Sequence, residues 1–142
     1  MATVRTPGDL TIHEGPARSF EWFWADDRSM PGLDAFETLT ARDRDAFLAS
    51  VKHWGKTPLG MTPASSRINV ESTNPLIVAI KVGKQRFTAF REDSGPTWIV
   101  YTHYLKEGIT RDKTGDRAVE RTKRARQHYI KQVKDGTYYE RG

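Results

Sequence analysis

Three cationic side chains fall inside β-patterned runs of the sequence rather than at their ends. Lys81, Arg86 and Arg91 belong to the segment LIVAIKVGKQRFTAFREDSGPTWIVYTH, residues 76–103, which reads as three strands joined by tight turns. A sheet that carries Lys and Arg on one face holds these charges rigidly and so provides a preorganised anion site. The residues therefore favour phosphate binding, as on a nucleic acid backbone.

Each strand cation suits a particular role. Arg86 is the favoured phosphate clamp, because a planar guanidinium holds two oxygens at once; the alternative is an ion pair with Glu92 or another surface carboxylate. Lys81 could stabilise transition-state charge or act as a base, and its alternative is an edge lysine whose ammonium group reaches solvent. Arg91 suits a secondary phosphate contact or an ordinary surface charge.

Residues at the end of the third run add candidate groups. Regular alternation places His103 on the face opposite Trp98. An imidazole exchanges protons near neutral pH, so His103 is a candidate acid or base; the alternative is a histidine packed in the core or its rim. Tyr104 could stack on a nucleobase, and Lys106 in the following loop suits a phosphate contact.

A basic helix is predicted over residues 116–135, ending at Gly136. Its buried face is expected to carry Ala118, Thr122, Ala125, Tyr129 and Val133. Seven Lys and Arg occupy its other faces, among them the candidate phosphate ligands Arg117, Arg121 and Arg124. Such cations give affinity without sequence preference. The alternative is a solvated face whose charges pair with Asp116, Glu120 and Asp135.

Composition limits the possible classes of protein. The chain has 142 residues and no cysteine, which fits one domain without disulfides or thiolate metal sites. No apolar run approaches a membrane span, and residues 1–16 lack a signal-peptide core, so we expect a cytoplasmic protein. Residues 1–57 have net charge −2 (7 Lys/Arg, 9 Asp/Glu) and residues 58–142 have +7 (16 and 9). This asymmetry points to a polyanionic partner.

The remaining segments complete the expected architecture. Residues 1–17 are predicted to be a flexible arm, with a short extended piece near residues 10–12, and residues 18–25 a strand. Residues 29–54 are predicted to form two helices packed as a hairpin, the second capped by Thr40 and Asp43. Residues 55–75 should be mostly loop, with a brief strand over 67–71. The expectation is an α+β domain over 18–135 and a short tail over 136–142.

These elements and three short motifs resemble the RelE/ParE toxin superfamily, closest to its HigB-like, phage-derived branch. The motifs are GKQRFTAFRE, WIVYTHYLKEG and AVERTKRARQHY. The family's basic strand-end residue matches Lys81, its Gly-turn-Arg-aromatic run matches Gly83 with Arg86-Phe87, and its final strand and loop match residues 103–106. The resemblance implies a RelE-like fold with an N-terminal strand, a two-helix hairpin, a three-stranded antiparallel sheet and a C-terminal basic helix.

The resemblance also implies a function. RelE-like toxins cleave mRNA in the ribosomal A site without a metal, by attack of a 2′-hydroxyl on the adjacent phosphate. On this basis Lys81, Arg86 and His103 would be catalytic, while mRNA, ribosomal RNA and a cognate antitoxin protein would be the partners. No cofactor, metal or membrane is expected. His13, His53 and His128 have no metal-ligand spacing.

Two alternatives stay open from the sequence. One is a ParE-like inhibitor of DNA gyrase, which binds without catalysis. The other is a phage or plasmid accessory protein that binds nucleic acid and does not cleave it. Glu107 favours the latter, because it stands where the family usually has the second of two lysines.

Overall fold

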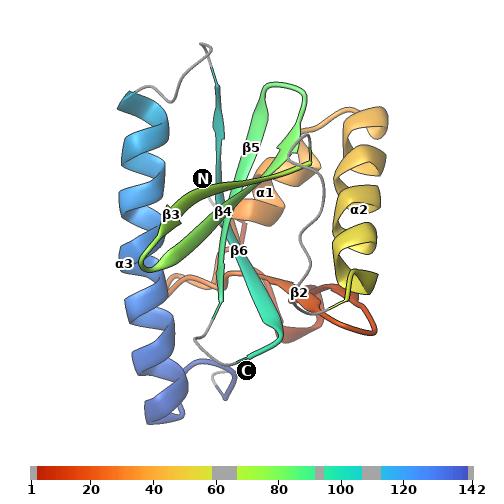
Figure 1. Cartoon of the computed structure of the whole chain (residues 1–142). Coiled ribbons are helices and arrows are strands. Elements are labelled where there is room, and N and C mark those ends of the chain that lie inside the picture. Colours follow the sequence, from red (N-terminus) through yellow and green to blue (C-terminus); the bar gives the residue numbers. More distant parts are fainter. Residues whose placement is uncertain (1–2, 59–66, 92–94, 107–112, 141–142) are drawn as a thin grey trace.

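A computed structural model describes residues 3–58, 67–91, 95–106 and 113–140 (Figure 1). The strands are β1 (Thr11–Glu14), β2 (Ser19–Trp22), β3 (Ile68–Thr73), β4 (Leu76–Val82), β5 (Gln85–Arg91) and β6 (Thr97–Leu105). The helices are α1 (Pro31–Glu37), α2 (Ala41–Lys56) and α3 (Lys113–Asp135), and a 3₁₀ turn spans Pro7–Asp9. The domain is therefore α+β.

The expected three-stranded antiparallel sheet is wrong, because the described strands form one mixed sheet of six. Their order is β1-β2-β6-β5-β4-β3, with β2 parallel to β6 and every other pair antiparallel. The expected N-terminal strand, β2, joins the sheet beside β6. β1 corresponds to the short extended piece expected near residues 10–12 of the arm, and β3 to the brief strand expected over residues 67–71. Both are short edge strands with weak periodicity.

The expected two-helix hairpin is also wrong, although the start of its second helix is confirmed. The Thr40 side chain accepts a hydrogen bond from the backbone N–H of Asp43 (3.2 Å), which caps α2. However, α1 packs on β6 and β2, whereas α2 packs on β4, β1 and β2. Gly32 explains the placement of α1, since a Cβ there would lie 2.9 Å from the indole of Trp22. Each of the two helices is thus positioned by its contacts with the sheet rather than by contacts with the other helix.

The sheet lies between two helical layers. In Figure 1, α3 covers one face and α2 covers the other. Phe47 of α2 packs edge-on against Phe87 of β5, with ring centroids 4.9 Å apart. On the opposite face Phe90 meets Tyr129 of α3 at 5.5 Å. Alternation along β5 therefore sends Phe87 toward α2, and Arg86, Thr88 and Phe90 toward α3.

The predicted buried face of α3 is confirmed. Ala118, Thr122, Ala125 and Tyr129 are buried, and Val133 is half-buried. The helix ends before Gly136, whose φ of +72° is the left-handed conformation that stops helices. The tight β4–β5 turn is confirmed as well. Gly83 has φ +59° and Lys84 does not have a positive φ, as a type II′ turn requires.

Candidate nucleic-acid interface

A β-bulge in β6 decides where the predicted catalytic residues lie. Thr88 of β5 pairs with Thr102, but the next residue, Ala89, pairs with Val100, which leaves Tyr101 as an extra residue in β6. An extra residue reverses the alternation of every later side chain. His103 consequently pairs with Phe87 on the α2 face of the sheet, the face that also carries Trp98.

The predicted catalytic residues are therefore divided between the two faces. Lys81 lies directly across from Arg86, and Arg86 lies directly across from Tyr104, so these three share the α3 face of adjacent strands. His103 lies on the other face, where its ring centroid is 5.1 Å from that of Phe87. The structure thus gathers two cations and a tyrosine without the imidazole.

The side chains of Arg86, Tyr104 and His103 already make hydrogen bonds within the protein. Arg86 is 8% exposed, and its Nη1 donates to the carbonyl oxygens of Gly83 (2.6 Å) and Gln85 (3.0 Å). Tyr104 is 5% exposed, and its hydroxyl donates to Glu71 (3.3 Å). The His103 ring contacts the side-chain amide of Gln85, and burial lowers the pKa of His103. This end of the sheet is built mainly for packing.

The two remaining candidate phosphate ligands of the sheet, Arg91 and Lys106, lie far from each other. Arg91 stacks over Trp98, with its guanidinium carbon 5.5 Å from the ring centroid, on the α2 face at the far end of β5. Lys106 directly follows β6, and its backbone N–H donates to Lys84 at the β4–β5 turn (2.8 Å). No single phosphate could contact both side chains.

α3 carries the clearest concentration of available charge. Arg117, Arg121 and Arg124 are exposed and lie on one side of the helix, at spacings of four and three residues. Within the described ranges, no hydrogen bond or ion pair is made by these three side chains. Other cations of α3 are engaged: Lys123 pairs with Glu120 (3.1 Å), and Lys131 with Asp135 (3.4 Å). The charge pairing expected of a solvated face is thus present for Lys123 and Lys131 but not for the three arginines.

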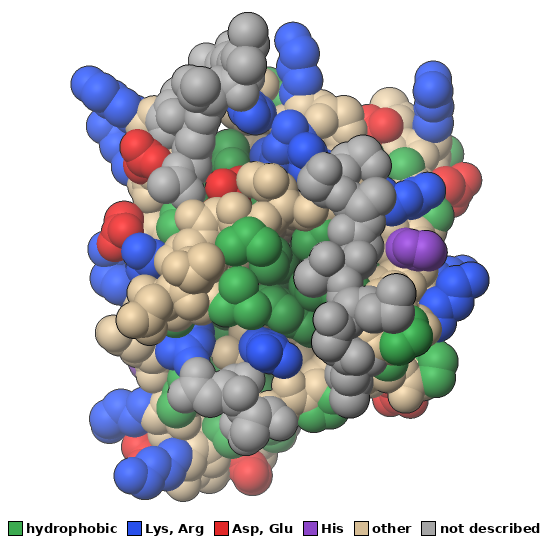
Figure 2. Space-filling model, viewed as in Figure 1, with side chains coloured by type: hydrophobic (Ala, Val, Ile, Leu, Met, Phe, Trp, Pro, Cys, Tyr) green, Lys and Arg blue, Asp and Glu red, His purple; other side chains and the backbone are tan. Residues whose placement is uncertain are grey.

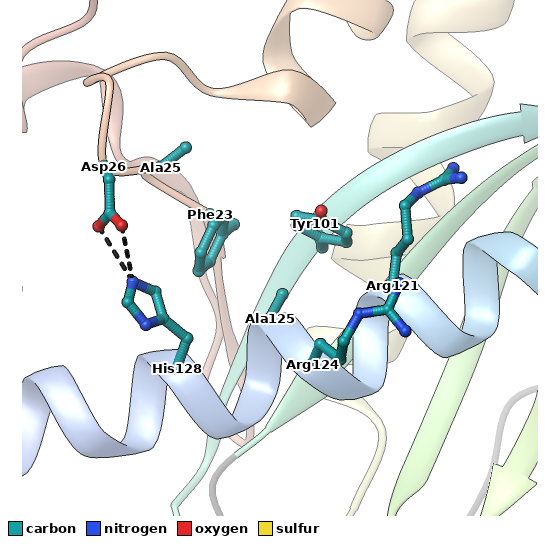
Figure 3. Close-up of a pocket in the computed structure, with 8 residues that line it drawn as sticks. All are labelled: Phe23, Ala25, Asp26, Tyr101, Arg121, Arg124, Ala125 and His128. Carbon is teal, nitrogen blue, oxygen red and sulfur yellow. Dashed lines mark hydrogen bonds and ion pairs between the residues drawn. The ribbon is translucent and has the colours of Figure 1, made fainter.

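A groove runs along this arginine-bearing side of α3 (Figure 3). One part has a volume of about 350 Å³ and is lined by Phe23, Ala25, Asp26, Tyr101, Arg121, Arg124, Ala125 and His128. A second hollow of about 410 Å³ is lined by Asp116, Arg117, Glu120, Arg121 and Arg124. Arg121 and Arg124 line both hollows, so the two are neighbours along the helix and are hereafter together called the α3 groove.

Aromatic side chains line the groove between its charged ends. Figure 3 shows Phe23 and Tyr101 between the arginines and His128, with Ala125 of α3 beside them. The rings of Phe23 and Tyr101 meet edge-on at 5.1 Å. Tyr101 is the bulged residue of β6, so the irregularity that moves His103 away also places a tyrosine here. Tyr101 is half-buried and can offer part of its ring to a ligand.

An acid–histidine pair closes the other end of the groove. His128 Nε2 lies 3.0 Å from both carboxylate oxygens of Asp26, and Gln132 donates to the same carboxylate (3.0 Å). The turn that presents Asp26 is held by Asp27, which accepts from the backbone N–H and hydroxyl of Ser29. These hydrogen bonds lower the pKa of Asp27. Sequence reasoning missed this pair because Asp26 and His128 are 102 residues apart.

The face that carries β3 and β4 has a different character. Figure 2 shows hydrophobic side chains gathered near its centre, with Lys and Arg beside them and at the periphery. Val70 of β3 is 52% exposed.

The described residues offer no metal site and no membrane-spanning helix, and comparison with known proteins assigns the chain to no family. Among the described residues, no group of three or more His, Cys, Asp or Glu side chains could hold a metal ion. In the same part of the chain, no helix has the length and apolar character needed to cross a membrane. The chain matches no protein-family model, and no curated protein is significantly similar to it.

Proposed function

We propose that the protein binds single-stranded RNA in the α3 groove. The observation that carries this proposal is the row of three exposed arginines, Arg117, Arg121 and Arg124, which have no partner within the described residues. Two of them, Arg121 and Arg124, also line the hollow that contains Phe23 and Tyr101. Guanidinium groups bind phosphate through paired hydrogen bonds, so an unpartnered row of them favours a polyanion.

The spacing of the arginines supports one extended strand as the ligand. Positions four and three residues apart are separated by about 6 and 4.5 Å along a helix axis. Neighbouring arginines can therefore contact successive phosphates of the same strand. A carboxylate-rich protein segment would need no aromatic floor, whereas unpaired bases stack on tyrosine and on arginine planes. Tyr101 and the arginine row together favour single-stranded RNA.

The toxin role implied by the RelE resemblance stays a prediction. Its expected catalytic residues do not meet, because His103 lies on the opposite face of the sheet from Lys81 and Arg86. RNA as the ligand does not depend on that trio. RNA binding in the α3 groove therefore needs only the arginines and aromatic side chains found there.

The test is fluorescence anisotropy of a labelled 12-nucleotide RNA as the salt concentration is varied. Three phosphate contacts on a single strand predict a slope of about −2 in a plot of log K against log salt concentration, since each contributes about −0.7. The double variant Arg121→Ala/Arg124→Ala should reduce the slope to about −0.7 and raise Kd at least about tenfold.

A matched control removes the same charge elsewhere. Arg42 and Lys52 are exposed on α2, on the other side of the sheet. Arg42→Ala/Lys52→Ala should leave the slope and Kd nearly unchanged. Equal losses for both double variants would mean that net charge alone drives binding. Tighter binding of duplex DNA than of the single-stranded RNA would also contradict the proposal.

A further inference from the structure

The larger chemical contrast within the α3 groove is between the two ends of one hollow. Arg121 and Arg124 lie at one end, Asp26 and His128 lie at the other, and Tyr101 lies between them (Figure 3). We propose that this hollow takes one nucleotide of the bound RNA and selects guanine, with the phosphate at the arginines and the Watson–Crick edge of the base at Asp26 and His128. The base preference rests on the proposed RNA binding and adds to it.

The hollow can accommodate a single nucleotide. Its volume of about 350 Å³ lies within the range of small-molecule sites, because Ala25 and Ala125 line it with small side chains. Arg121 and Arg124 precede His128 by seven and four residues, which is about 10.5 and 6 Å along the helix axis. One nucleotide spans a similar distance from its phosphate to the far edge of its base, so it can contact both ends at once.

Tyr101 provides a surface on which the base can lie. Its ring is half-buried, and the ring of Phe23 meets it edge-on at 5.1 Å, which supports it from the side of the core. Unpaired bases stack on tyrosine with little preference among them, since every base has a π-face. Stacking therefore holds a base in the hollow, and the choice of base depends on the polar groups at its edge.

The polar end of the hollow presents hydrogen-bond acceptors. His128 Nε2 lies 3.0 Å from both carboxylate oxygens of Asp26. An ionised carboxylate only accepts, so Nε2 of the neutral imidazole donates to Asp26 and Nδ1 keeps a lone pair. A carboxylate has about four acceptor sites, so Asp26 can accept from a base while it holds His128. The carboxylate and Nδ1 are therefore two acceptors at the same end.

Guanine is the RNA base whose edge matches two acceptors. Its N1–H and its 2-amino group are adjacent donors on the Watson–Crick edge. Adenine and cytosine each have one amino donor beside a ring nitrogen that accepts, and uracil has one N–H between two carbonyl oxygens. An accepting atom of these bases would face the carboxylate of Asp26, which is unfavourable. The hydrogen-bonding pattern therefore selects guanine.

The carboxylate that receives the base is held in place by the protein. Gln132 of α3 donates to Asp26 (3.0 Å). The turn that carries Asp26 is fixed by Asp27, which accepts from the backbone N–H (2.9 Å) and the hydroxyl (2.6 Å) of Ser29. Groups that are already ordered discriminate better between ligands, because little ordering is left to occur on binding.

Fluorescence anisotropy with the full chain tests the base preference. Four labelled 12-nucleotide RNAs are uridine-rich and differ only in one central base, which is guanine, adenine, hypoxanthine or 7-deazaguanine. The guanine RNA should bind at least about fivefold more tightly than the adenine RNA, as two matched hydrogen bonds imply. Hypoxanthine lacks the 2-amino group and should give an intermediate Kd. 7-Deazaguanine keeps both donors and should match guanine.

Substitution of Asp26 tests which residue selects the base. Asp26→Asn replaces the carboxylate by an amide that also donates, so it should reduce the ratio of the adenine and guanine Kd values to less than about twofold. A ratio is used because the change in net charge affects both RNAs equally. Asp45→Asn removes the same charge from an exposed position on α2 and should leave the ratio unchanged. Circular dichroism checks that both variants are folded.

Competition with free nucleotides tests whether the hollow acts as part of an RNA site. Guanosine 5′-monophosphate should displace the labelled RNA at a lower concentration than adenosine 5′-monophosphate, because it carries the selected base. It should still bind more weakly than the guanine RNA, since it has no further phosphate for Arg117.

Three results would overturn the base preference and leave RNA binding standing. One is equal affinity for the guanine and adenine RNAs. Another is a preference that survives Asp26→Asn. The third is a preference that is lost with 7-deazaguanine, because N7 lies away from the Watson–Crick edge. Failure of all four RNAs to bind, or a free guanine nucleotide that binds more tightly than RNA, would instead refute the proposed function.

Discussion

The packing of α3 on the sheet includes a hydrogen bond between two buried hydroxyl groups, and its contribution to the free energy of unfolding can be measured. Thr122 of α3 and Thr88 of β5 are both fully buried, and their Oγ1 atoms lie 2.8 Å apart. Thr122 Oγ1 also lies 2.6 Å from the carbonyl oxygen of Ala118. Substituting Thr122→Val keeps the shape but removes this partner from the Thr88 hydroxyl, which retains a longer contact with the carbonyl oxygen of Thr102 (3.4 Å).

The expected cost follows from that geometry. The loss of one hydrogen bond between groups that keep another partner destabilises a protein by about 0.5–1.5 kcal/mol, against a typical total of about 5–15 kcal/mol. Thr122→Val should therefore lower the free energy of unfolding by about 0.5–1.5 kcal/mol. The double variant Thr88→Val/Thr122→Val should be less destabilised than the sum of the two single variants, because both single variants remove the same hydrogen bond.

Urea unfolding monitored by tryptophan fluorescence measures these free energies for the wild type, both single variants and the double variant. Strict additivity, or a loss below about 0.3 kcal/mol for Thr122→Val, would refute the claim that this pair fixes α3 to β5. The same series should weaken RNA binding only as far as it unfolds the protein, since neither threonine lines the groove.

Three further predictions concern the frame around the groove. Gly32→Ala should destabilise the fold by about 1–3 kcal/mol in urea unfolding, because the added methyl would lie 2.9 Å from the indole of Trp22; unchanged stability would contradict the packing of α1. Burial raises the pKa of Glu21, so its stabilising contribution is present at low pH and lost as pH rises through the folded-state pKa. Glu21→Gln should therefore gain stability relative to the wild type between pH 4 and pH 8, and a gap that does not change with pH would refute this. Tyr138→Phe should cost about 0.5–1.5 kcal/mol in thermal unfolding, because the hydrogen bond from the backbone N–H of Trp24 to the Tyr138 hydroxyl (2.7 Å) is lost; an unchanged melting temperature would count against that bond.

The sequence predicts local elements well where periodicity is strong. Residues 118, 122, 125 and 129 repeat at helical spacing and are buried in α3. The Gly83 turn and the Thr40 cap follow from residue chemistry at single positions and are confirmed. The sheet is harder, because β1 and β3 are short and their order depends on contacts between distant segments. Six strands with a parallel β2–β6 pair could not be read from alternation alone.

The candidate site depends on features that periodicity cannot predict. Regular alternation would put His103 on the same face as Lys81 and Arg86, but the bulge at Tyr101 reverses it. No residue type at position 101 announces a bulge, since tyrosine is common in regular strands. The row of arginines on α3 was visible in the sequence. The Asp26–His128 pair at the other end of the groove was not visible, because the two residues are 102 positions apart in the sequence.

Photochemical cross-linking tests the central claim most directly. RNA that carries 5-iodouridine reacts with aromatic side chains in contact with its bases, and tandem mass spectrometry of the digested complex locates the cross-linked residue. The α3 groove predicts cross-links at Tyr101, reduced when Arg121 and Arg124 are replaced by alanine. Cross-links at Tyr104, or at residues of α2 with none at Tyr101, would place the RNA elsewhere and contradict the account.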